Sequence, residues 1–488
     1  MKKKEHYVNN KEFLEAITVY RNKVLKSKEL GEPRPRVPEY IGECFLKIAT
    51  HLSYRPNFVN YMFKDDMICD GIENCLQYID NFDPQKSSNP FAYFTQIIYF
   101  AFLRRIQREK KQLDIKTEQV KDVFTHLVKM SDIPILPALA APEQYAYRNK
   151  MDFSTGVSRW LLKENDPGTP EDRAIGLHAP GRFDKILDID ACLLQDDKCN
   201  EIFREIRSWA LENGITLNNP REYTGFLRSV MIRKGEHSGE VMVNLITRHE
   251  DKKLLQPFVK SINDKFPEVT SIVNNITNST GDHSIGEREI LLYGESVIHD
   301  TLDGLKYEIS ANAFFQTNTK GAEQLYNTIV DFADLKPDMV VWDFYSGAGS
   351  ISLYIADKVK QVIGFEAVRD AVKNAKKNAK RNNVPHCQFF EANLDTFLQT
   401  NQDLIAKLDK PNLAIVDPPR AGLNPKFVKQ LIGLKPPSIV YVSCNPSTQA
   451  RDIALLVEAG YVVEKIQPVD MFPHTAHIET VAKLSLEI

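Results

Sequence analysis

The segment MVVWDFYSGAGSISL, residues 339–353, is the clearest indication of fold class in the C-terminal part of the chain. Its apolar first half predicts a buried strand, and a turn containing Gly347 and Gly349 then opens a helix. Glycines in such a turn let the backbone approach a ligand closely at the carboxyl edge of a sheet. From the G-x-G alone, a plain strand-to-helix turn and a small-ligand site both remain open; the absence of the G-x-G-x-x-G spacing of dinucleotide-binding folds is one feature that narrows the choice.

Strands and helices alternate regularly from about residue 331 onward. Apolar segments that predict further strands are QVIGFE (361–366), CQFFEAN (387–393), NLAIVDPP (412–419) and SIVYVSC (438–444). Apolar strands that alternate with helices are typical of a mostly parallel sheet covered on both faces.

Polar residues stand at the carboxyl ends of four consecutive strands. They are Asp343, Glu366, Asn393 and Asp417. A carboxylate at the position of Glu366 can accept hydrogen bonds from both hydroxyls of a ribose. The whole layout resembles that of S-adenosylmethionine-dependent methyltransferases, and it favours a cofactor site over a plain turn.

Two further residues at this edge carry possible chemistry. Cys444 follows the fifth apolar strand directly, and Glu479 begins the last strand, with His474 and His477 nearby. A lone cysteine is more often a small buried apolar residue, and a lone glutamate is more often on the surface. However, a cysteine and a carboxylate together suit methyl transfer to a ring carbon that is a poor nucleophile. Carbon 5 of uracil is such an atom, and a thiolate must first add to carbon 6. A base must later remove the hydrogen from carbon 5, which a carboxylate can do.

Residues ~117–488 resemble the RNA (uracil-5-)-methyltransferase family, which makes 5-methyluridine in bacterial ribosomal and transfer RNA. The matching segments are FFQTN at 314–318, DFYSGAGSISL, GFEAV, EANLD, VDPPRAGL at 416–423, SCNPSTQARD at 443–452 and MFPHTAHIE at 471–479. The resemblance implies Cys444 as the nucleophile and Glu479 as the proton acceptor. The residues that it implies for S-adenosylmethionine are Gln316, Tyr345, Ser350, Glu366, Asn393 and Asp417.

The expected activity is methylation of carbon 5 of a uridine in RNA, with 23S ribosomal RNA expected before transfer RNA. Cytosine-5 methylation of RNA also uses a cysteine, but SCNP and the HIE ending resemble the uracil enzymes better. YRNKMDF at 147–153 and GLHAPGRFDKILDIDACLL at 176–194 look like the central RNA-binding domain of this family.

The chain departs from the family at its front end. Many members carry an N-terminal oligonucleotide-binding barrel and a four-cysteine iron–sulfur site. Cys192 matches the last of these ligands, but the other three should lie just upstream of residue 117 and are absent, and Cys199 does not match. We therefore expect no iron–sulfur cluster and no other metal.

Residues 7–115 carry a different resemblance, to the late-transcription sigma factor of T-even-type phages, a reduced form of sigma region 2. The segments are YVNNKEFLEAI and MICDGIENCLQYIDNFDPQKSSNPFAYFTQIIYFAFLRRIQREKKQ, which predict helices over 11–25, 65–80 and 91–111. The resemblance implies RNA polymerase and promoter DNA as partners.

The nucleic-acid candidates of this front end form two groups. The aromatic residues that either stack on bases or form the core of a helical bundle are Phe91, Tyr93, Phe94 and Tyr99; we favour the core. The basic candidates for phosphates are Arg104, Arg105, Arg108, Lys110 and Lys111. Residues 1–116 carry 20 Lys and Arg against 15 Asp and Glu, which fits either a nucleic-acid contact or a solvated surface.

The predicted fold is therefore multidomain. A helical sigma-like domain spans 1–116, a central α+β RNA-binding domain spans 117–300, and a Rossmann-like α/β methyltransferase domain spans 301–488. Two hypotheses follow: an RNA (uracil-5-)-methyltransferase with an appended sigma-like module, or a transcription factor that carries a methyltransferase. Since both resemblances stop near residues 112–118, an accidental join is a third possibility, which mass spectrometry of peptides spanning that region would test.

Composition agrees with a cytoplasmic globular protein of two to four domains. Of 488 residues, 43% are hydrophobic and 26% are charged, which excludes a disordered or fibrous chain. Seven cysteines are too few for a disulfide scaffold. The start MKKKEHYVNN lacks the apolar region of a secretion signal, and the longest apolar stretch, 91–103, is too short for a membrane span.

Overall fold

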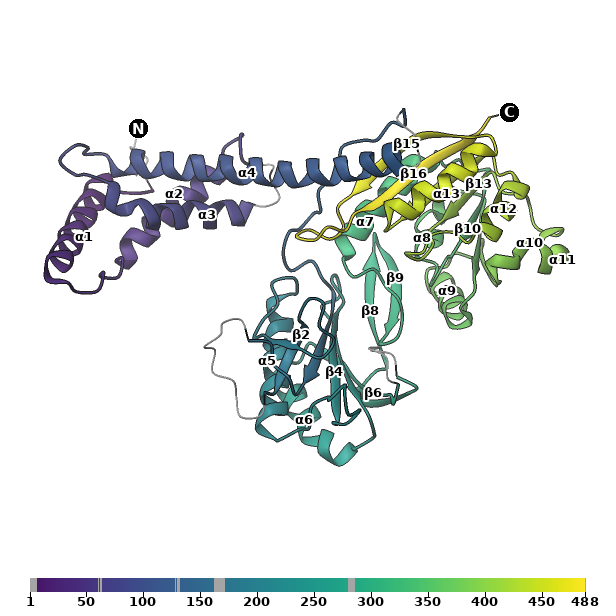
Figure 1. Ribbon diagram of the computed structural model, residues 1–488, viewed down its shortest axis with the longest axis horizontal. Coiled ribbons are helices and arrows are strands. Elements are labelled where there is room, and N and C mark those ends of the chain that lie inside the picture. The colour runs from purple at the N-terminus through teal and green to yellow at the C-terminus, as the bar shows by residue number, and fades with distance from the viewer. Residues whose placement is uncertain are drawn as a thin grey trace. The chain divides into compact units, whose positions relative to one another are not determined.

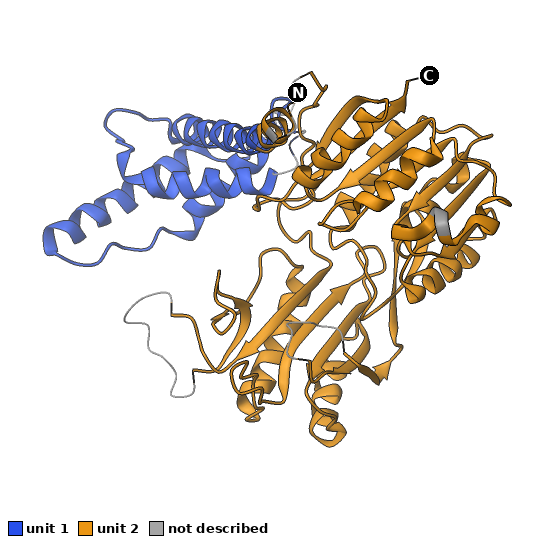
Figure 2. Ribbon diagram, turned by 45° about the vertical axis from the view of Figure 1, so that its right-hand side comes forward, with its two compact units in different colours: residues 1–115 blue, residues 116–488 orange. Residues whose placement is uncertain are grey.

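The computed structural model describes residues 7–59, 61, 64–127, 129, 132–161, 172–279 and 286–487. The chain divides into two compact units, Met1–Ile115 and Lys116–Ile488 (Figure 2). The first six residues, on which the expectation about a secretion signal depends, lie outside the described residues. None of the helices in the described ranges combines the length and the apolar character that crossing a membrane requires.

The first unit is helical. Its elements are α1 (Asn10–Leu30), α2 (Glu39–Ser53), α3 (Lys64–Tyr78), the 3-10 turn η1 (Ile79–Asn81) and α4 (Pro90–Asp122), which crosses the boundary between the units. Asn9 caps α1 by accepting from the backbone N–H of Lys11, and Gly31 ends it in the left-handed conformation. An aromatic core joins the helices: the ring centroids of Phe45 and Phe94 are 4.7 Å apart.

All three helices expected in the first unit are present, and one of them is longer than expected. α4 continues eleven residues beyond Lys111, because Val120 and the following Phe124 are apolar at helical spacing and are fully buried. Phe94 is fully buried, and Phe91, Tyr93 and Tyr99 pack against the same core. The aromatic residues are therefore core residues of the bundle.

A seven-stranded sheet forms the centre of the chain, in the order β3-β2-β1-β4-β5-β6-β7. Its strands are β1 (Lys150–Gly156), β2 (Ala174–His178), β3 (Ile186–Asp188), β4 (Leu227–Lys234), β5 (Val241–Thr247), β6 (Val269–Ile276) and β7 (Arg288–Gly294). The helices α5 (Asp197–Glu212) and α6 (Lys252–Lys265) pack on one face (Figure 1). Strands and helices in this part of the chain agree with the α+β class that the sequence predicts for it.

A second seven-stranded sheet follows, in the order β12-β11-β10-β13-β14-β16-β15. Its strands are β10 (Val340–Phe344), β11 (Gln361–Glu366), β12 (Cys387–Glu391), β13 (Leu413–Val416), β14 (Ser438–Ser443), β15 (Tyr461–Val469) and β16 (Glu479–Leu486). The first five pair in parallel, whereas β16 is antiparallel to both β14 and β15. The mostly parallel sheet that the sequence predicts is therefore present.

Helices cover both faces of this second sheet (Figure 1). One face packs on α7 (Thr319–Ala333), α8 (Ser350–Tyr354) and α9 (Arg369–Arg381). The other packs on α12 (Pro425–Leu434) and α13 (Pro446–Glu458). Along β10, Val341 faces the first core, and Val340 and Trp342 face the second, as the two-residue period of a strand requires. Shorter elements are α10 (Phe397–Thr400), α11 (Gln402–Ile405), η3 (Ala356–Lys358) and η4 (Leu394–Thr396).

Residues just after the unit boundary belong to the core of the second sheet. Val120 in α4 and Phe124 in the π-helical turn η2 (Val123–Leu127) are buried there. Farther along, the backbone N–H groups of Leu136 and Leu139 donate to carbonyls of β15. The sequence-based division assigns this segment to the central domain, but its packing is with the methyltransferase sheet. The further boundary at residue 300 stays a prediction; nearby, β8 (Val297–Leu302) and β9 (Leu305–Ser310) form a separate hairpin.

Candidate active site

The predicted polar residues lie at the carboxyl edge of the second sheet. Asp343 is the fourth residue of β10, Glu366 ends β11, and Asp417 follows β13 directly. Asn393 comes two residues after β12 and caps η4, where its side chain accepts from the N–H of Asp395 at 3.0 Å. Because neighbouring parallel strands end at the same edge, these residues from four strands share one rim.

The glycine turn after β10 forms a cradle of backbone. Gly347 and Gly349 have φ values of 52° and 82°, which favour glycine. A Cβ on Gly349 would come within 2.8 Å of the Phe389 ring, whereas a Cβ on Gly347 would meet nothing within 4 Å. The space above Gly347 is thus open, and Glu366 accepts the N–H of Gly347 at 3.0 Å and that of Val368 at 2.8 Å. The turn and Glu366 are thus joined by hydrogen bonds and form one side of the candidate ligand site.

Asp343 is the buried acid beneath this turn. It is fully buried, and its Oδ2 accepts from the hydroxyl of Ser352 at 2.5 Å, whereas Oδ1 has no partner among the described residues. Burial raises the pKa of Asp343 to about 7. An unpaired buried oxygen beside an open backbone turn fits a ligand with positive charge or hydrogen-bond donors.

The remaining cofactor candidates line the same region from other elements. Tyr345 follows β10 with φ of 64° and packs edge-on against Phe427. Ser350 begins α8, and Tyr307 donates to its carbonyl at 3.5 Å while packing against Phe315, the residue before Gln316. The backbone of Gln316 is fixed by the side chain of Asn149, which donates to its carbonyl at 2.7 Å.

Cys444 and Glu479 are neighbours through strand pairing. β14 and β16 are antiparallel with Ser443 opposite Thr480, and the Thr480 hydroxyl donates to the Ser443 carbonyl at 3.2 Å. One step beyond this pair, Cys444 is opposite Glu479. Residues that are opposite in an antiparallel pair point to the same face of the sheet. The pairing thus brings together two side chains that are 35 positions apart in the sequence.

Burial and charge control the protonation of both groups. Burial raises the pKa of the Cys444 thiol; the carboxyl groups of Glu479 and Asp417 raise it further, and Arg420 lowers it. Glu479 is 8% exposed, and its burial raises its pKa to about 7, against the opposing influence of Arg420. Burial also raises the pKa of Asp417, assisted by the charges of Glu479 and Asp343. The site therefore concentrates acids that hold their protons more tightly than usual.

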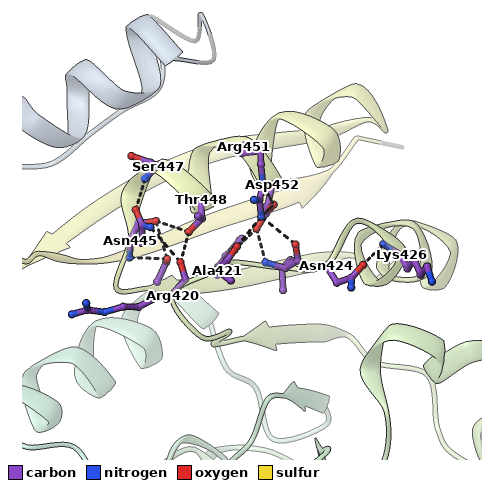
Figure 3. A network of polar contacts seen from close by, with 12 residues as sticks. Arg420, Ala421, Asn424, Lys426, Asn445, Ser447, Thr448, Arg451 and Asp452 are labelled. Atoms are coloured by element: carbon purple, nitrogen blue, oxygen red, sulfur yellow. Dashed lines mark hydrogen bonds and ion pairs between the residues drawn. The ribbon is translucent and has the colours of Figure 1, made fainter. Parts of the chain in front are cut away.

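Arg420, which the sequence analysis quotes only as part of a motif, is anchored by its backbone. Its carbonyl accepts from Asn445 Nδ2 at 3.2 Å and from the Thr448 hydroxyl at 3.3 Å. Figure 3 shows its side chain extending away from these contacts. In the same network, the buried Asp452 accepts from the N–H of Leu423 at 2.7 Å. These bonds join the loop that carries Asp417 and Arg420 to the loop that carries Cys444.

The segment before Glu479 is also held from several sides. Lys116 is buried and donates to Asp470 at 2.7 Å, and Asn318 donates to the Met471 carbonyl at 2.8 Å. The hydroxyl of Tyr147 donates to the Pro473 carbonyl at 3.2 Å. Burial lowers the pKa of His477, and the positive charges of Arg420, Lys116 and Arg148 lower it further. No role for Lys116, Arg148 or Arg420 follows from the sequence, because no local pattern indicates that these three residues converge.

Cys192, the predicted match to an iron–sulfur ligand, lies away from any metal-binding group in the described residues. Cys192 is buried, its N–H is bonded to Asn200, and within the described ranges no group of metal-ligating side chains is found.

Arg105 donates to both oxygens of Asp70, at 2.6 and 2.8 Å, and to Glu109. This guanidinium joins α3 to α4, so the phosphate-contact prediction fits it poorly. Arg104 donates to Asn74, and Arg108, Lys110 and Lys111 are exposed.

Comparison with known proteins places this site in a family. A sequence profile described as tRNA (uracil-5-)-methyltransferase matches residues 236–486. An RNA methyltransferase of Chlorobaculum tepidum is 39% identical over 376 residues, which cover 76% of this chain and 78% of the relative. The chain belongs to the tRNA (uracil-5-)-methyltransferase family. Another relative of this family, an RNA methyltransferase of Bacteroides thetaiotaomicron, is 36% identical over 77% of this chain and 83% of its own length.

A solved structure agrees with the family assignment. The Pyrococcus abyssi tRNA (uracil-54, C5)-methyltransferase, in complex with S-adenosyl-L-homocysteine, superimposes with a TM-score of 0.61 at 30% identity. The match covers 77% of this chain and 83% of that one. The protein is therefore an S-adenosylmethionine-dependent RNA (uracil-5-)-methyltransferase. The family and these relatives give no support for RNA polymerase or promoter DNA as partners.

Proposed function

We propose that the protein methylates carbon 5 of a uridine in RNA through a covalent adduct with Cys444. The observation that carries this proposal is the pairing of Ser443 with Thr480, which makes Cys444 and Glu479 neighbours at the end of two strands. A nucleophile and a base on one face of a sheet, beside the cofactor edge, are the two groups that this chemistry requires.

The residues of the chain act in a defined order. The Cys444 thiolate adds to carbon 6 of the uracil, and the electron pair of the 5,6 double bond moves toward carbon 5 and the carbonyl at carbon 4. When bound, S-adenosylmethionine supplies the methyl group, as an electrophile, to carbon 5. Glu479, in its ionised form, then takes the proton from carbon 5, the double bond forms again, and the thiolate leaves.

The cofactor is proposed to lie along the rim at the ends of β10 to β13. The open space above Gly347 and the unpaired oxygen of Asp343 support this position. The residues proposed to hold it are Gln316, Tyr345, Ser350, Glu366, Asn393 and Asp417. A positively charged sulfonium near Asp343 and Asp417 favours the ionised forms of these acids, so binding is expected to release protons.

The RNA class is a separate part of the proposal. The sequence resemblance favours 23S ribosomal RNA, whereas the structural neighbour from Pyrococcus abyssi acts on uracil 54 of transfer RNA. We propose ribosomal RNA as the substrate, and transfer of tritium from labelled S-adenosylmethionine onto gel-separated RNA decides between the two classes. Label on transfer RNA alone would overturn the ribosomal assignment and leave the chemistry intact.

The test of the chemistry uses two variants and a matched control. Cys444→Ala should abolish methyl transfer, and Glu479→Gln should accumulate a covalent protein–RNA adduct on a denaturing gel, because the methylated adduct cannot lose its proton. Cys69→Ala changes an exposed thiol elsewhere and should behave as the wild type. Full transfer by Cys444→Ala would overturn the covalent mechanism.

For residues 7–115, the sigma-like role remains a prediction. The exposed cations Arg108, Lys110 and Lys111 at one end of a folded helical bundle are the observation that favours it. The test of this role compares the binding of promoter DNA by the wild-type full chain with that by the triple variant Arg108→Ala/Lys110→Ala/Lys111→Ala. Equal retention of DNA by both proteins would exclude these side chains as phosphate contacts.

A further inference from the structure

We propose that Tyr145, Arg148 and His474 form the binding site for the nucleotide next to the target uridine. The inference rests on the proposed function and names how the RNA is held beside the reacting base. It concerns a second nucleotide of the substrate, which neither the nucleophile, the base nor the cofactor rim contacts.

The first observation is a stacked aromatic pair. The rings of Tyr145 and His474 lie 4.6 Å apart with an interplanar angle of 26°. Both side chains are exposed, Tyr145 to 37%. Aromatic rings in a core are normally covered, so a stacked pair that stays open to solvent has surface available for another ring. A nucleobase is such a ring, and stacking accepts any base.

The second observation is a guanidinium with little to bind. The Nε of Arg148 is buried and has no hydrogen-bond partner among the described residues, and Nη1 donates only to the sulfur of Met151 at 3.7 Å. The group lies 6.0 Å from the centre of the Phe472 ring. Because the residue is only partly buried, the guanidinium nitrogens beyond Nε are the ones that a phosphate can reach.

The third observation connects this group to the reaction. His474 precedes Glu479 by five residues, and Tyr147, between Tyr145 and Arg148, donates to the carbonyl of Pro473 at 3.2 Å. The backbone of His474 has φ of 64°, a conformation that costs energy for histidine and is held by this packing. The ring pair and the cation therefore lie beside the start of the segment that leads to Glu479, and this is where we expect the nucleotide that adjoins the target.

The atoms suggest how the parts divide the work. The neighbouring base stacks on the Tyr145–His474 pair, and Arg148 binds a phosphate of the same strand. Stacking and phosphate contacts hold a strand whose target base has left its own stack. The pair would thus replace part of the stacking that the RNA loses when uracil enters the site.

The experiment measures RNA binding and methyl transfer separately in the full chain. Tyr145→Ala and His474→Asn should each raise the KM for total cellular RNA at least fivefold. Each should also raise the dissociation constant for a labelled 12-nucleotide oligouridylate, measured by filter binding, at least fivefold. The KM for S-adenosylmethionine should stay within twofold. Asparagine is chosen at position 474 because it tolerates the left-handed conformation. Tyr145→Phe keeps the ring and should bind as the wild type.

Arg148 is tested by salt dependence. Arg148→Ala should reduce by about one the slope of log affinity against log salt for the oligouridylate, and Arg148→Lys should restore the slope. Tyr78→Ala at the end of α3, a tyrosine of similar 40% exposure that lies outside the predicted RNA-binding domain, and Arg369→Ala at the start of α9 are the controls. Neither should change RNA binding.

The outcomes separate this inference from the proposed function. RNA binding within twofold of the wild type in folded Tyr145→Ala and His474→Asn proteins would overturn the inference, whether or not methyl transfer occurs. A parallel loss of cofactor affinity would also overturn it, since the pair would then only support the loop. Absence of methyl transfer by the wild type would contradict the proposed function, while oligouridylate binding would still decide the role of the pair.

Discussion

The side chain of Asn149 donates a hydrogen bond of 2.7 Å to the backbone carbonyl of Gln316, 167 positions later in the chain. The same amide donates to the Thr319 hydroxyl at 2.9 Å, and the backbone N–H of Asn149 donates to the Thr317 carbonyl at 2.8 Å. Asn149 directly precedes β1, so these bonds connect the central sheet to the loop proposed to bind the cofactor. The segment 147–153, whose sequence resembles an RNA-binding domain, thus contains a residue that fixes the loop proposed to bind the cofactor.

Replacing Asn149 should weaken cofactor binding. Asn149→Ala removes two side-chain hydrogen bonds, each worth about 1 kcal/mol net, so the dissociation constant for S-adenosylmethionine should rise on the order of 10- to 30-fold. Calorimetric titration of the full chain measures this. Asn213→Ala is the control, because Asn213 makes a comparable bond to the Trp209 carbonyl on an exposed helix end. Unchanged affinity in Asn149→Ala would show that the loop keeps its shape without these bonds.

Glu479 should make the stability of the protein depend on pH. Its pKa is raised to about 7 in the folded protein, whereas an unfolded glutamate titrates near 4.5. Between pH 4.5 and 7 the folded state therefore binds more protons than the unfolded state. Protonated Glu479 stabilises the folded state relative to ionised Glu479, and this stabilisation is lost as the pH rises from about 4.5 to 7. Glu479→Gln removes the effect. At pH 8 its free energy of unfolding should exceed that of the wild type by roughly 1–3 kcal/mol, and its melting temperature should be correspondingly higher. At pH 4.5 no such gain is expected.

The same shift applies to the reaction rate. In the proposed mechanism, proton removal from carbon 5 needs ionised Glu479, and addition needs the thiolate of Cys444, whose pKa is also raised. The rate with RNA should therefore increase with pH through about 7 and continue to increase above it. Adduct formation by Glu479→Gln should keep the part of this dependence that comes from the thiol. A rate independent of pH between 6 and 8 would contradict both assignments.

Arg420 should control the reactivity of the nucleophile. Its positive charge lowers the pKa of the Cys444 thiol, so Arg420→Ala should raise that pKa and reduce the thiolate fraction at pH 7.5. Alkylation of Cys444 by iodoacetamide should slow by about three- to tenfold, and Arg420→Lys should keep most of the wild-type rate. Mass spectrometry of the modified peptides follows both Cys444 and the exposed Cys69. An equal slowing at both cysteines would point to a general change instead.

The ion pair between Lys116 and Asp470 should be important for stability. Both side chains are 7% exposed, so Lys116→Met leaves a buried charge without its partner and should cost about 3–5 kcal/mol. The double variant Lys116→Met/Asp470→Leu should recover most of this loss in urea unfolding. Lys121→Met breaks the exposed pair with Glu118 and should cost about 1 kcal/mol or less. Similar losses in Lys116→Met and Lys121→Met would contradict the argument.

Local sequence pattern was sufficient for the parallel sheet and its rim. The segments 340–344, 361–366 and 438–443 are short, apolar and separated by helices, so their strand character depends on residues within a few positions. Since the carboxyl ends of parallel strands meet at one edge, Asp343, Glu366 and Asp417 follow from the same pattern. The length of α4 does not follow from the local pattern, because Val120 and Phe124 extend the helix only by packing on a sheet that is distant in the sequence.

Local patterns in the sequence therefore predict the α/β class of the methyltransferase sheet, the polar residues at its carboxyl edge and, through the motifs, the family. Which side chains come into contact depends on tertiary packing. β16 lies antiparallel between β14 and β15, so that Cys444 and Glu479 become neighbours. Asn149, Lys116, Arg148 and Arg420 converge on the same region from three separate segments. The physical reason is that strand order and buried hydrogen bonds depend on long-range packing, which no local period of apolar residues encodes.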